Sequence, residues 1–392
     1  MYNTVLLSVT GKDKPGITSS LTEILSESNI KILDIEQVVI HDILSLSLII
    51  KLEKTNKDVL KDLLFKAKEI GINLDFEVIE ENFISRTSKN TYVITCLGNE
   101  ISALLIFELS KILSSFNVNI EKIYKLNEGI LNCLEMVVNT ENNINLKLLK
   151  QELLSLVNKH NTDIAFQKEN LYRKSKRLLV LDMDMTLIQI EVIDQIASLC
   201  GKDKEVHEIT ELAMNGIIDF DTSLIKRVSL LEGLEEKKLE LVYKNIKYTE
   251  GAKELIKISK ELGYKVAVIS GGFTYFTERI KKDLGLDYAY ANTLEIKNGK
   301  LTGEIKGQII NAEKKAEILC KIAKDNNISL DQVIAVGDGA NDIPMLQKAG
   351  LGIAFNAKPK VKEKAKFSLS KRPLSTIFYL LGINEKDMKN LL

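Results

Sequence analysis

The sequence carries no surplus of charge of either sign. Among its 392 residues, 54 are Lys or Arg and 54 are Asp or Glu, so the formal net charge is zero. A protein that holds nucleic acid by its phosphates is expected to be rich in Lys and Arg. The balance therefore argues against nucleic acid as a partner.

Long apolar runs are also missing. No stretch approaches the ~20 apolar residues that a helix needs to cross a bilayer. The opening residues, MYNTVLLSVTGKDKPG, lack the charged start and the long apolar region of a secretion signal. We therefore expect no membrane partner.

Cysteine and histidine are few and scattered. The cysteines lack CxxC spacing, and the histidines lack metal-ligand spacing. Scattered cysteines in apolar surroundings are typical of buried free thiols in a reducing compartment, which predicts a cytoplasmic protein. These residues are Cys96, Cys133, Cys200 and Cys320, and His41, His160 and His207.

The rest of the composition is that of a globular protein. Hydrophobic residues make up 45% of the chain and charged residues 28%, which is enough for a sizeable core. At 392 residues the chain is longer than one typical domain, so two or three domains are expected.

A pair of aspartates follows a short apolar run near the middle of the chain. Residues 178–181 (LLVL) have the pattern of a strand buried on both faces of a parallel sheet. Asp182 and Asp184 come directly after it, where open α/β sheets place their active sites. Two crowded carboxylates need a compensating cation, and Mg²⁺ prefers oxygen ligands. An aspartate-rich turn would explain the same residues, so the aspartate pair alone does not distinguish an active site from a turn.

Two later segments contain groups that suit an anion. Residues 266–272 (VAVISGG) form a second apolar run, which ends in Ser270 and two glycines whose backbone N–H groups can approach an anion closely. Residues 312–319 (AEKKAEIL) begin a helix with Lys314 and Lys315 in its first turns. Cations are unfavourable near a helix N-terminus, so a lysine there indicates a nearby anion.

A third segment completes an ordered set. Residues 333–346 (VIAVGDGANDIPML) form another apolar run, which ends in Asp338 and is followed by Asn341 and Asp342 at the start of a helix. The order is acid pair, Ser-Gly-Gly, lysine and GDGxND. This set resembles that of the haloacid dehalogenase-like phosphatases, and the resemblance extends from about Arg177 to the end of the chain.

The resemblance implies phosphoryl transfer through an aspartyl-phosphate. Asp182 would attack phosphorus, and Asp184 would protonate the departing oxygen and then activate water. Mg²⁺ would lie between Asp182, the backbone carbonyl of Asp184 and Asp338. Asp342 would support the metal without binding it directly.

The same resemblance assigns the groups that bind phosphate. Ser270, the amide of Gly271 and a lysine would hold phosphate oxygens, and Asn341 would reach the substrate or phosphate. Family spacing places the lysine directly before AEIL, which favours Lys315 over the lysine that precedes it. The family usually has Ser or Thr where Met185 stands, and we expect this side chain to point away from the nucleophile.

Residues 191–250 are expected to be an insertion between the first and second core strands. They have helical periodicity, and in the family such an insertion is a cap that closes over the substrate and excludes water. Its motifs, IQIEVID and AMNGIIDFDTSLIKRVSLL, resemble those of phosphoserine phosphatases. This resemblance implies that Glu191 faces the substrate amine and that Arg227 pairs with its carboxylate. Phe220 and Met214 would form an apolar wall.

The segment 177–392 that contains these motifs is expected to be α/β. Its parallel strands and helical crossovers predict a doubly wound parallel sheet, the fold of the haloacid dehalogenase-like core. Residues 291–305 predict a β-hairpin with its turn at Asn298-Gly299.

The first 168 residues hold two similar segments. Residues 1–84 are expected to form strand, helix, strand, strand, helix, strand, and residues 91–168 repeat this order. The order is ferredoxin-like, with helices on one face of an antiparallel sheet. The strand, DKPGI and helix at the start resemble the ACT domain, whereas the second copy has NEISA instead. The resemblance implies an amino-acid effector or dimerisation, and family analogy implies a homodimer.

A polar, basic segment separates the second repeat from the acid pair. Residues 168–177 (KENLYRKSKR) contain no apolar pattern, which predicts a solvated linker.

Three hypotheses for function follow. The leading one is hydrolysis of O-phospho-L-serine to L-serine and phosphate, the last step of L-serine biosynthesis. The second keeps the catalytic core but changes the substrate to phosphohomoserine, phosphothreonine or another small phosphate ester. The third is an amino-acid-responsive binding protein with a vestigial phosphatase core. The intact set of Asp182, Asp184, Ser270, Lys315 and Asp338 argues against the third.

Overall fold

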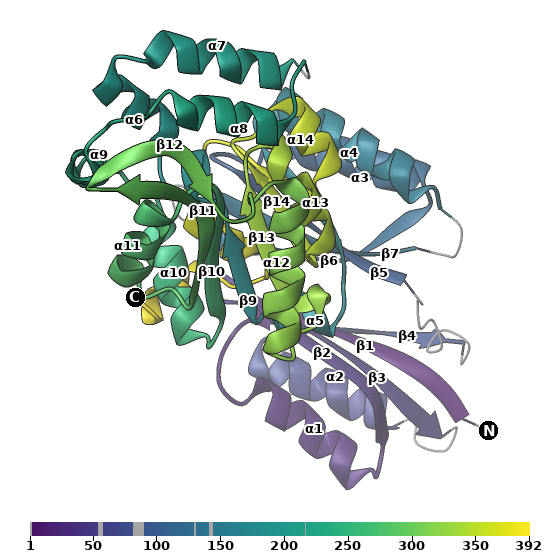
Figure 1. Ribbon diagram of the computed structural model, residues 1–392. Helices are drawn as coiled ribbons and strands as arrows, with labels where there is room; N and C mark the ends of the chain where they lie inside the picture. The colour runs from purple at the N-terminus through teal and green to yellow at the C-terminus, as the bar shows by residue number, and fades with distance from the viewer. Residues whose placement is uncertain (1, 54–57, 81–89, 129–130, 141–143, 216) are drawn as a thin grey trace. The chain divides into compact units, whose positions relative to one another are not determined.

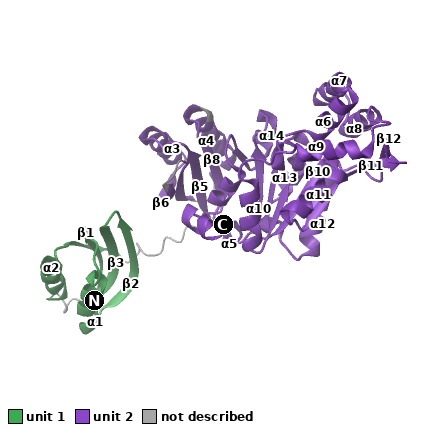
Figure 2. Cartoon of the chain, turned by 90° about the vertical axis from the view of Figure 1, so that its left-hand side faces the viewer, with its two compact units in different colours: residues 1–87 green, residues 88–392 purple. Residues whose placement is uncertain are grey.

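The chain divides into two compact units, residues 1–87 and residues 88–392 (Figure 2). The computed structural model describes residues 2–53, 58–80, 90–128, 131–140, 144–215 and 217–392. The domain boundary expected near residue 84 lies outside the described residues. In the part of the chain that is described, no helix is long and apolar enough to cross a membrane.

The first unit has the expected βαββαβ order and an antiparallel sheet with the strand order β2-β3-β1-β4. Alternate side chains of the central strands, such as Leu7 and Leu46, are buried against the helices through Leu21 and Leu63. The elements are β1 (Tyr2–Lys12), α1 (Ile17–Glu27), β2 (Lys31–Ile40), β3 (Ile43–Glu53), α2 (Asp58–Ile70) and β4 (Asn73–Ile79).

The second unit begins with another ferredoxin-like module, whose sheet has the equivalent order β6-β7-β5-β8. Ser102 and Asn145 cap its two helices, because each side chain accepts a hydrogen bond from a backbone N–H of the first turn. The elements are β5 (Asn90–Gly98), α3 (Ala103–Ser115), β6 (Val118–Glu128), β7 (Asn132–Thr140), α4 (Leu146–His160) and β8 (Asp163–Lys168).

The remainder of the second unit is built on a sheet with the order β12-β11-β10-β9-β13-β14-β15. Neighbouring strands from β11 to β15 are parallel, whereas β12 pairs antiparallel with β11. The expected doubly wound parallel sheet is therefore confirmed. The strands are β9 (Leu178–Leu181), β10 (Lys265–Phe273), β11 (Tyr288–Lys297), β12 (Lys300–Lys306), β13 (Val333–Gly337), β14 (Leu351–Phe355) and β15 (Phe367–Leu369).

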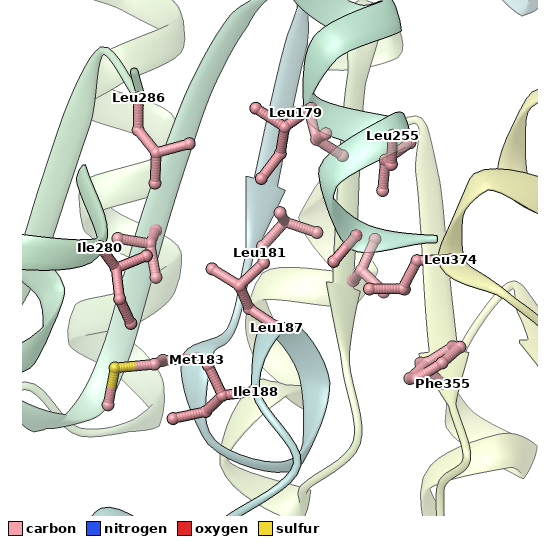
Figure 3. Packing of buried hydrophobic residues seen from close by; sticks show 14 of the residues in the cluster. Leu179, Leu181, Met183, Leu187, Ile188, Leu255, Ile280, Leu286, Phe355 and Leu374 are labelled. Atoms are coloured by element: carbon pink, nitrogen blue, oxygen red, sulfur yellow. The ribbon is translucent and has the colours of Figure 1, made fainter. Parts of the chain in front are cut away.

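Strand β9 lies at the centre of this sheet and is buried on both faces. Leu179 and Leu181 pack towards α10 (Ala252–Glu261) and α11 (Thr274–Leu284) (Figure 3). Leu178 and Val180 belong to the core on the opposite face, with α12 (Ala312–Asp325) and α13 (Ile343–Lys348). Helices on both faces explain why this strand is a continuous apolar run instead of an alternating one.

Between β9 and β10 the chain forms the expected helical cap. Helices α7 and α8 lie side by side above the β11–β12 hairpin (Figure 1). The hairpin turns at Asn298 and Gly299, which both have positive φ, as a two-residue hairpin turn requires. The cap helices are α6 (Val192–Cys200), α7 (Asp203–Met214), α8 (Phe220–Ser229) and α9 (Leu239–Lys244).

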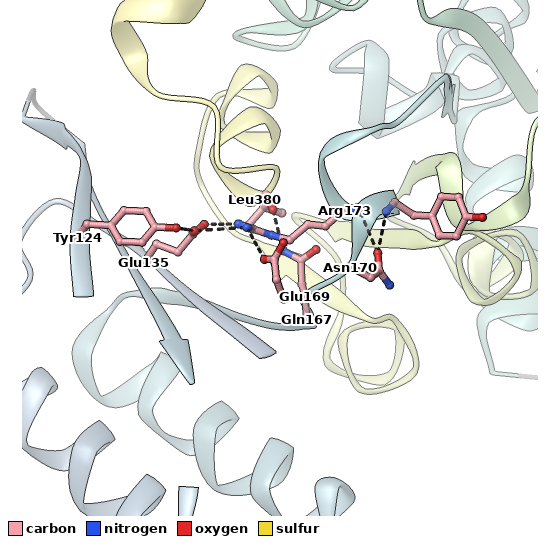
Figure 4. A network of polar contacts seen from close by, with 8 residues as sticks. Tyr124, Glu135, Gln167, Glu169, Asn170, Arg173 and Leu380 are labelled. Atoms are coloured by element: carbon pink, nitrogen blue, oxygen red, sulfur yellow. Dashed lines mark hydrogen bonds and ion pairs between the residues drawn. The ribbon is translucent and has the colours of Figure 1, made fainter. Parts of the chain in front are cut away.

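The prediction that residues 168–177 form a solvated linker is wrong at Arg173 and Lys176, which are buried, although most of the segment is exposed. They contain the short helix α5 (Leu171–Lys174), and the side chain of Arg173 is only 2% exposed. Its guanidinium pairs with the fully buried Glu135 of β7, which also accepts a hydrogen bond from Tyr124, and with Glu169 at 3.0 Å (Figure 4). A buried carboxylate from a distant strand therefore supplies the counter-charge for Arg173, while most of the segment around it stays exposed.

The C-terminal segment covers the sheet face of the second module that α3 and α4 leave open. The side-chain amide of Gln167 donates to the carbonyl of Leu380 at 2.8 Å, and that of Asn127 donates to the hydroxyl of Tyr379 at 2.8 Å. Leu97 and Cys133 belong to the same hydrophobic cluster as helix α15 (Ile377–Leu380), which precedes the last helix, α16 (Glu385–Asn390). This shared core makes residues 88–392 one compact unit.

Candidate active site

The acidic and polar side chains lie where three neighbouring strands end. Leu181 at the end of β9 is paired with Val268 of β10 and with Val336 of β13. Because parallel strands bring their carboxyl ends to one edge of a sheet, the residues that follow these strands lie close together. The amide of Asp182 donates to the carbonyl of Val336 at 2.9 Å and fixes the first of these residues.

A tight π-type turn (Met183–Leu187) follows the first aspartate. Met183, Leu187 and Ile188 anchor the turn in the hydrophobic core (Figure 3). The turn directs Asp184 back towards the strand ends, where its carboxylate accepts a hydrogen bond from the Val192 amide at 3.0 Å. Met185 has a φ of 55°, and its side chain is 44% exposed.

Ser270 lies in the C-terminal part of β10 and contacts the second aspartate. Its hydroxyl lies 3.3 Å from Asp184 Oδ2 and accepts a hydrogen bond from the Gly272 amide at 2.8 Å. A Cβ atom at Gly272 would lie 2.7 Å from Asp184 Oδ2 and 2.9 Å from the terminal carbon of Met183. Glycine is therefore required here by close approach, independently of backbone dihedral angles.

A fully buried lysine reaches the first aspartate from helix α12. Lys315 Nζ lies 2.8 Å from Asp182 Oδ1 and 2.8 Å from Asp342 Oδ1. The preceding residue, Lys314, instead pairs with Glu317 at 2.9 Å near the surface. The structure thus brings Lys315 into the site and leaves Lys314 outside it.

Three carboxylates form a group that could hold a metal ion. Oxygens of Asp182, Asp338 and Asp342 all lie within 4.8 Å of one another. The Thr186 hydroxyl orients Asp338 at 2.9 Å, and the Gly339 amide donates to Asp342 Oδ2 at 3.0 Å. Asp342 pairs with Lys315 through Oδ1 and accepts the Gly339 amide at Oδ2. With both oxygens engaged in this way, Asp342 is suited to orienting these neighbouring groups. An oxygen-only donor set of this kind is what Mg²⁺ prefers.

Burial and crowding raise the pKa values of the aspartates in the site. Burial, reinforced by the charge of Asp342, raises the pKa of Asp182 to about 8 and that of Asp338 to about 7, although Lys315 opposes both shifts. Burial, followed by the charges of Glu191 and Asp182, raises the pKa of Asp184 well above its ordinary value. The site therefore has more negative charge than its own lysine neutralises, which a divalent cation would offset.

Glu191 and Arg227 lie on the cap side of this cleft. Arg227 is on α8, and its Nε is buried without a hydrogen-bond partner among the described residues. Loss of hydration, followed by the charges of Asp182 and Asp194, raises the pKa of Glu191 to about 7, while Arg227 opposes the shift. A buried guanidinium with a free Nε beside a carboxylate is suited to a zwitterionic ligand.

The two apolar residues expected in the wall are placed differently. The ring of Phe220 lies against Gly271, because a Cβ atom there would be 3.0 Å from the ring and 3.8 Å from the Asn341 amide nitrogen. Met214 is 62% exposed, and its sulfur lies 3.7 Å from Lys358 Nζ. The structure therefore brings Phe220, Gly271 and Asn341 together and leaves Met214 at the rim.

Sequence reasoning missed Asn292, which is buried in the middle of β11. Its side-chain amide donates to the carbonyl of Gly271 at 2.8 Å, and its oxygen accepts from the Ile310 amide at 2.8 Å. It fixes the orientation of the peptide between Gly271 and Gly272. A polar residue within an apolar strand was the available signal, but its partner lies in a distant segment.

Comparisons with known proteins agree with this architecture. A family model described as haloacid dehalogenase-like hydrolase matches residues 179–347, and two ACT-domain models match residues 3–77 and 90–167. Among solved structures, a haloacid dehalogenase family hydrolase from Salmonella enterica serovar Typhi is similar with a TM-score of 0.65 and 30% identity, covering 74% of this chain and 98% of that one. The fold and the site define a haloacid dehalogenase-like hydrolase with ACT domains.

Relatives of higher sequence identity show to which family of haloacid dehalogenase-like hydrolases the chain belongs. A phosphoserine phosphatase of Streptomyces coelicolor is 37% identical over 388 residues, which cover 98% of this chain and 94% of the relative. One from Archaeoglobus fulgidus is 52% identical over 229 residues, 58% of this chain and 67% of the relative. A solved phospho-aspartyl intermediate analogue of a phosphoserine phosphatase is 52% identical, with a TM-score of 0.50 over 53% of this chain and 99% of that one. The chain belongs to the phosphoserine phosphatase family.

Proposed function

We propose that the protein hydrolyses O-phospho-L-serine to L-serine and phosphate, the last step of L-serine biosynthesis. The observation that carries this proposal is the pairing of two dissimilar halves in one cleft. Asp182, Asp184 and Lys315 suit a phosphate ester. Glu191 suits an ammonium, and Arg227, whose buried Nε has no hydrogen-bond partner among the described residues, suits a carboxylate. Phosphoserine has all three groups.

The reaction starts with Asp182. One of its oxygens is held by Lys315 at 2.8 Å, and the carboxylate attacks phosphorus to form an aspartyl-phosphate as the bond to the seryl oxygen breaks. Asp184, whose pKa is raised by burial, carries the proton that the seryl oxygen takes. The same carboxylate then removes a proton from the water that attacks phosphorus and releases phosphate. Proton transfer of this kind contributes typically ~10²–10⁴-fold.

The phosphate oxygens have donors on two sides. The Ser270 hydroxyl, the Gly271 amide and Lys315 would bind them, with Gly271 oriented by Asn292. Asn341, beside Gly271, would reach the substrate. Donors that are fixed before the reaction stabilise the charge that develops on a transferring phosphoryl group.

Mg²⁺ is the cofactor that the donor set fits. Asp182 and Asp338 would hold it together with the backbone carbonyl of Asp184, and Asp342 would orient its neighbours. When bound, the ion neutralises charge that otherwise keeps a phosphate dianion away from two carboxylates.

Phosphate release from L-phosphoserine tests the chemistry. We expect Mg²⁺-dependent release by the wild type and a loss of at least about a thousandfold in Asp182→Asn, because an amide cannot act as the nucleophile. Release from other esters but not from phosphoserine would leave the core chemistry intact and overturn the proposed substrate. Undiminished release by Asp182→Asn would overturn the mechanism.

Arg227→Ala tests the substrate. Removing a guanidinium that grips a carboxylate should lower kcat/KM for phosphoserine roughly 100-fold or more, while turnover of an aryl phosphate without a carboxylate changes little. Lys226→Ala is the matched control, because Lys226 is an exposed cation on the same helix. Equal losses on both substrates would show that Arg227 serves the cap's structure and not recognition.

The remaining proposals concern the effector, the oligomeric state and the cellular location of the protein. ACT domains typically bind amino-acid effectors, and we assign this role to the two N-terminal modules. A cytoplasmic homodimer agrees with the free state of Cys96, Cys133, Cys200 and Cys320 and with the family analogy.

A further inference from the structure

Among the described residues, the cap contacts the core in several places, and two of them differ in character. On the hairpin side, backbone hydrogen bonds join Gly233 to Leu301 and Glu236 to Gly299, each at 2.9 Å. These contacts lie away from the phosphate-binding lysine and hold the cap at its base. The second place is on helix α12, where Asn311 contacts the cap helix α8.

Asn311 has two tasks at the start of α12. Its Oδ1 accepts from the Lys314 amide at 3.1 Å, and its backbone carbonyl accepts from the Lys315 amide at 2.9 Å, so it forms the N-cap of this helix. Its Nδ2 lies 3.2 Å from both carboxylate oxygens of Asp221 in the first turn of α8. Both side chains are half-buried.

This contact joins the two halves of the substrate cleft. On the cap side, Asp221 directly follows Phe220, whose ring lies against Gly271, and shares its helix with Arg227. On the core side, Asn311 organises the turn from which Lys315 reaches Asp182. Other polar contacts, such as those of Tyr243 with Asp283 and of Tyr275 with Glu240, also join the cap to the core. Within the described ranges, the contact between Asn311 and Asp221 is the one that links the helix carrying Arg227 to the turn carrying Lys315.

We propose that Asn311 and Asp221 form a latch that sets the closed position of the cap. They are positioning residues, which act through Arg227 and Phe220 on one side and Lys315 on the other. The inference rests on the proposed function only for the choice of substrate, since the latch would serve any phosphate ester that needs the closed cap.

Two single variants separate the latch from helix capping. Asn311→Ser keeps an N-cap oxygen but loses the amide donor, so kcat/KM for phosphoserine should fall about tenfold, the value of a hydrogen bond to a charged group. Asn311→Asp also keeps the cap but places two carboxylates face to face, so the loss should be larger, roughly 100-fold. Hydrogen exchange should increase in α8 and stay unchanged in α12.

A reciprocal exchange provides the decisive test. In Asn311→Asp/Asp221→Asn the donor and acceptor change sides, so kcat/KM should return to within about threefold of the wild type. Asn145→Ser, an N-cap of α4 in the second module, is the matched control and should leave kcat/KM unchanged. Failure of the double variant to recover, or wild-type turnover by Asn311→Ser, would overturn the latch.

The outcome is distinguishable from failure of the proposed function. Wild-type turnover of phosphoserine is measured first. If the wild type instead hydrolyses another phosphate ester, the same variants are compared on that ester, and the rescue still decides for or against the latch. A folded state is checked by circular dichroism, and unaltered α12 exchange excludes a collapsed helix as the cause of a loss.

Discussion

At the scale of single residues, the geometry of the site depends on how closely the backbone at Gly271 and Gly272 approaches neighbouring side chains. Gly271 and Gly272 are neighbours with opposite surroundings. A Cβ atom at Gly272 would meet Asp184 Oδ2 at 2.7 Å, whereas one at Gly271 would meet the end of the Phe220 ring at 3.0 Å. The second neighbour is the tip of a side chain that can move, while Asp184 is fixed by the Val192 amide and Ser270.

Alanine substitution at these two glycines should therefore have different effects. We expect Gly272→Ala to lower kcat by about 100-fold or more, because Asp184 loses the position from which it transfers a proton. Gly271→Ala should mainly raise KM, because it displaces Phe220 in the substrate wall. Steady-state kinetics with phosphoserine would measure both. Equal changes of kcat in the two variants would contradict the assignment of Asp184.

At the scale of elements, two neighbouring strands, β9 and β13, bring their following aspartates together at one edge of the sheet. Burial raises the pKa of Asp182 to about 8 and that of Asp338 to about 7. Between the ordinary carboxyl pKa near ~4 and these values, the folded protein binds more protons than the unfolded chain. In the absence of metal, the contribution of these two carboxyl groups to the free energy of unfolding therefore falls as the pH rises through that window.

Magnesium should counteract this loss, because it binds the ionised carboxylates. We expect the rise in melting temperature on adding Mg²⁺ to be larger at pH 8 than at pH 5, where protons compete with the metal. Thermal unfolding with and without Mg²⁺ would measure it. In Asp338→Asn the rise should be small at both pH values. An equal rise at pH 5 and pH 8 in the wild type would show that the metal binds elsewhere.

The sequence predicts the secondary-structure elements better than it predicts the contacts between distant segments. The apolar runs of β9, β10 and β13 are bounded by polar residues, so the strands follow from local pattern alone, as do the aspartates after β9 and β13. The contacts made by Asn292, Asn311 and the helix α5 could not be foreseen. Each depends on a partner from another segment, and a sequence pattern does not specify which distant residues meet.

At the scale of the whole molecule, the two ferredoxin-like modules have diverged on one sheet face. In the first module, Ser8 on β1 and Ser45 on β3 are exposed on the face opposite the helices. In the second, Leu97 on β5 and Glu135 on β7 are buried by the phosphatase segment. The repeat thus retains its strand order while one copy has become part of the catalytic unit.

The pair of Glu135 and Arg173 provides a test of that integration. Glu135→Gln leaves the guanidinium of Arg173 buried with only the partly exposed Glu169 as counter-charge, so the free energy of unfolding of residues 88–392 should fall by about 3 kcal/mol. Glu135→Gln/Arg173→Met should lose less, because no unpaired charge remains. Glu69→Gln, in an exposed pair of the first unit, is the control and should change stability by less than about 0.5 kcal/mol.

Urea unfolding of the full chain, followed by circular dichroism and by phosphatase activity, would measure these effects. In Glu135→Gln, activity and the main structural transition should both move to lower urea by the same amount, because the second module and the catalytic sheet share one hydrophobic core. Loss of the second module's structure while activity persists to the wild-type urea concentration would mean that the module unfolds separately. Coincident shifts would instead show that the second ACT domain stabilises the strand that carries Asp182, since α5 leads directly into β9.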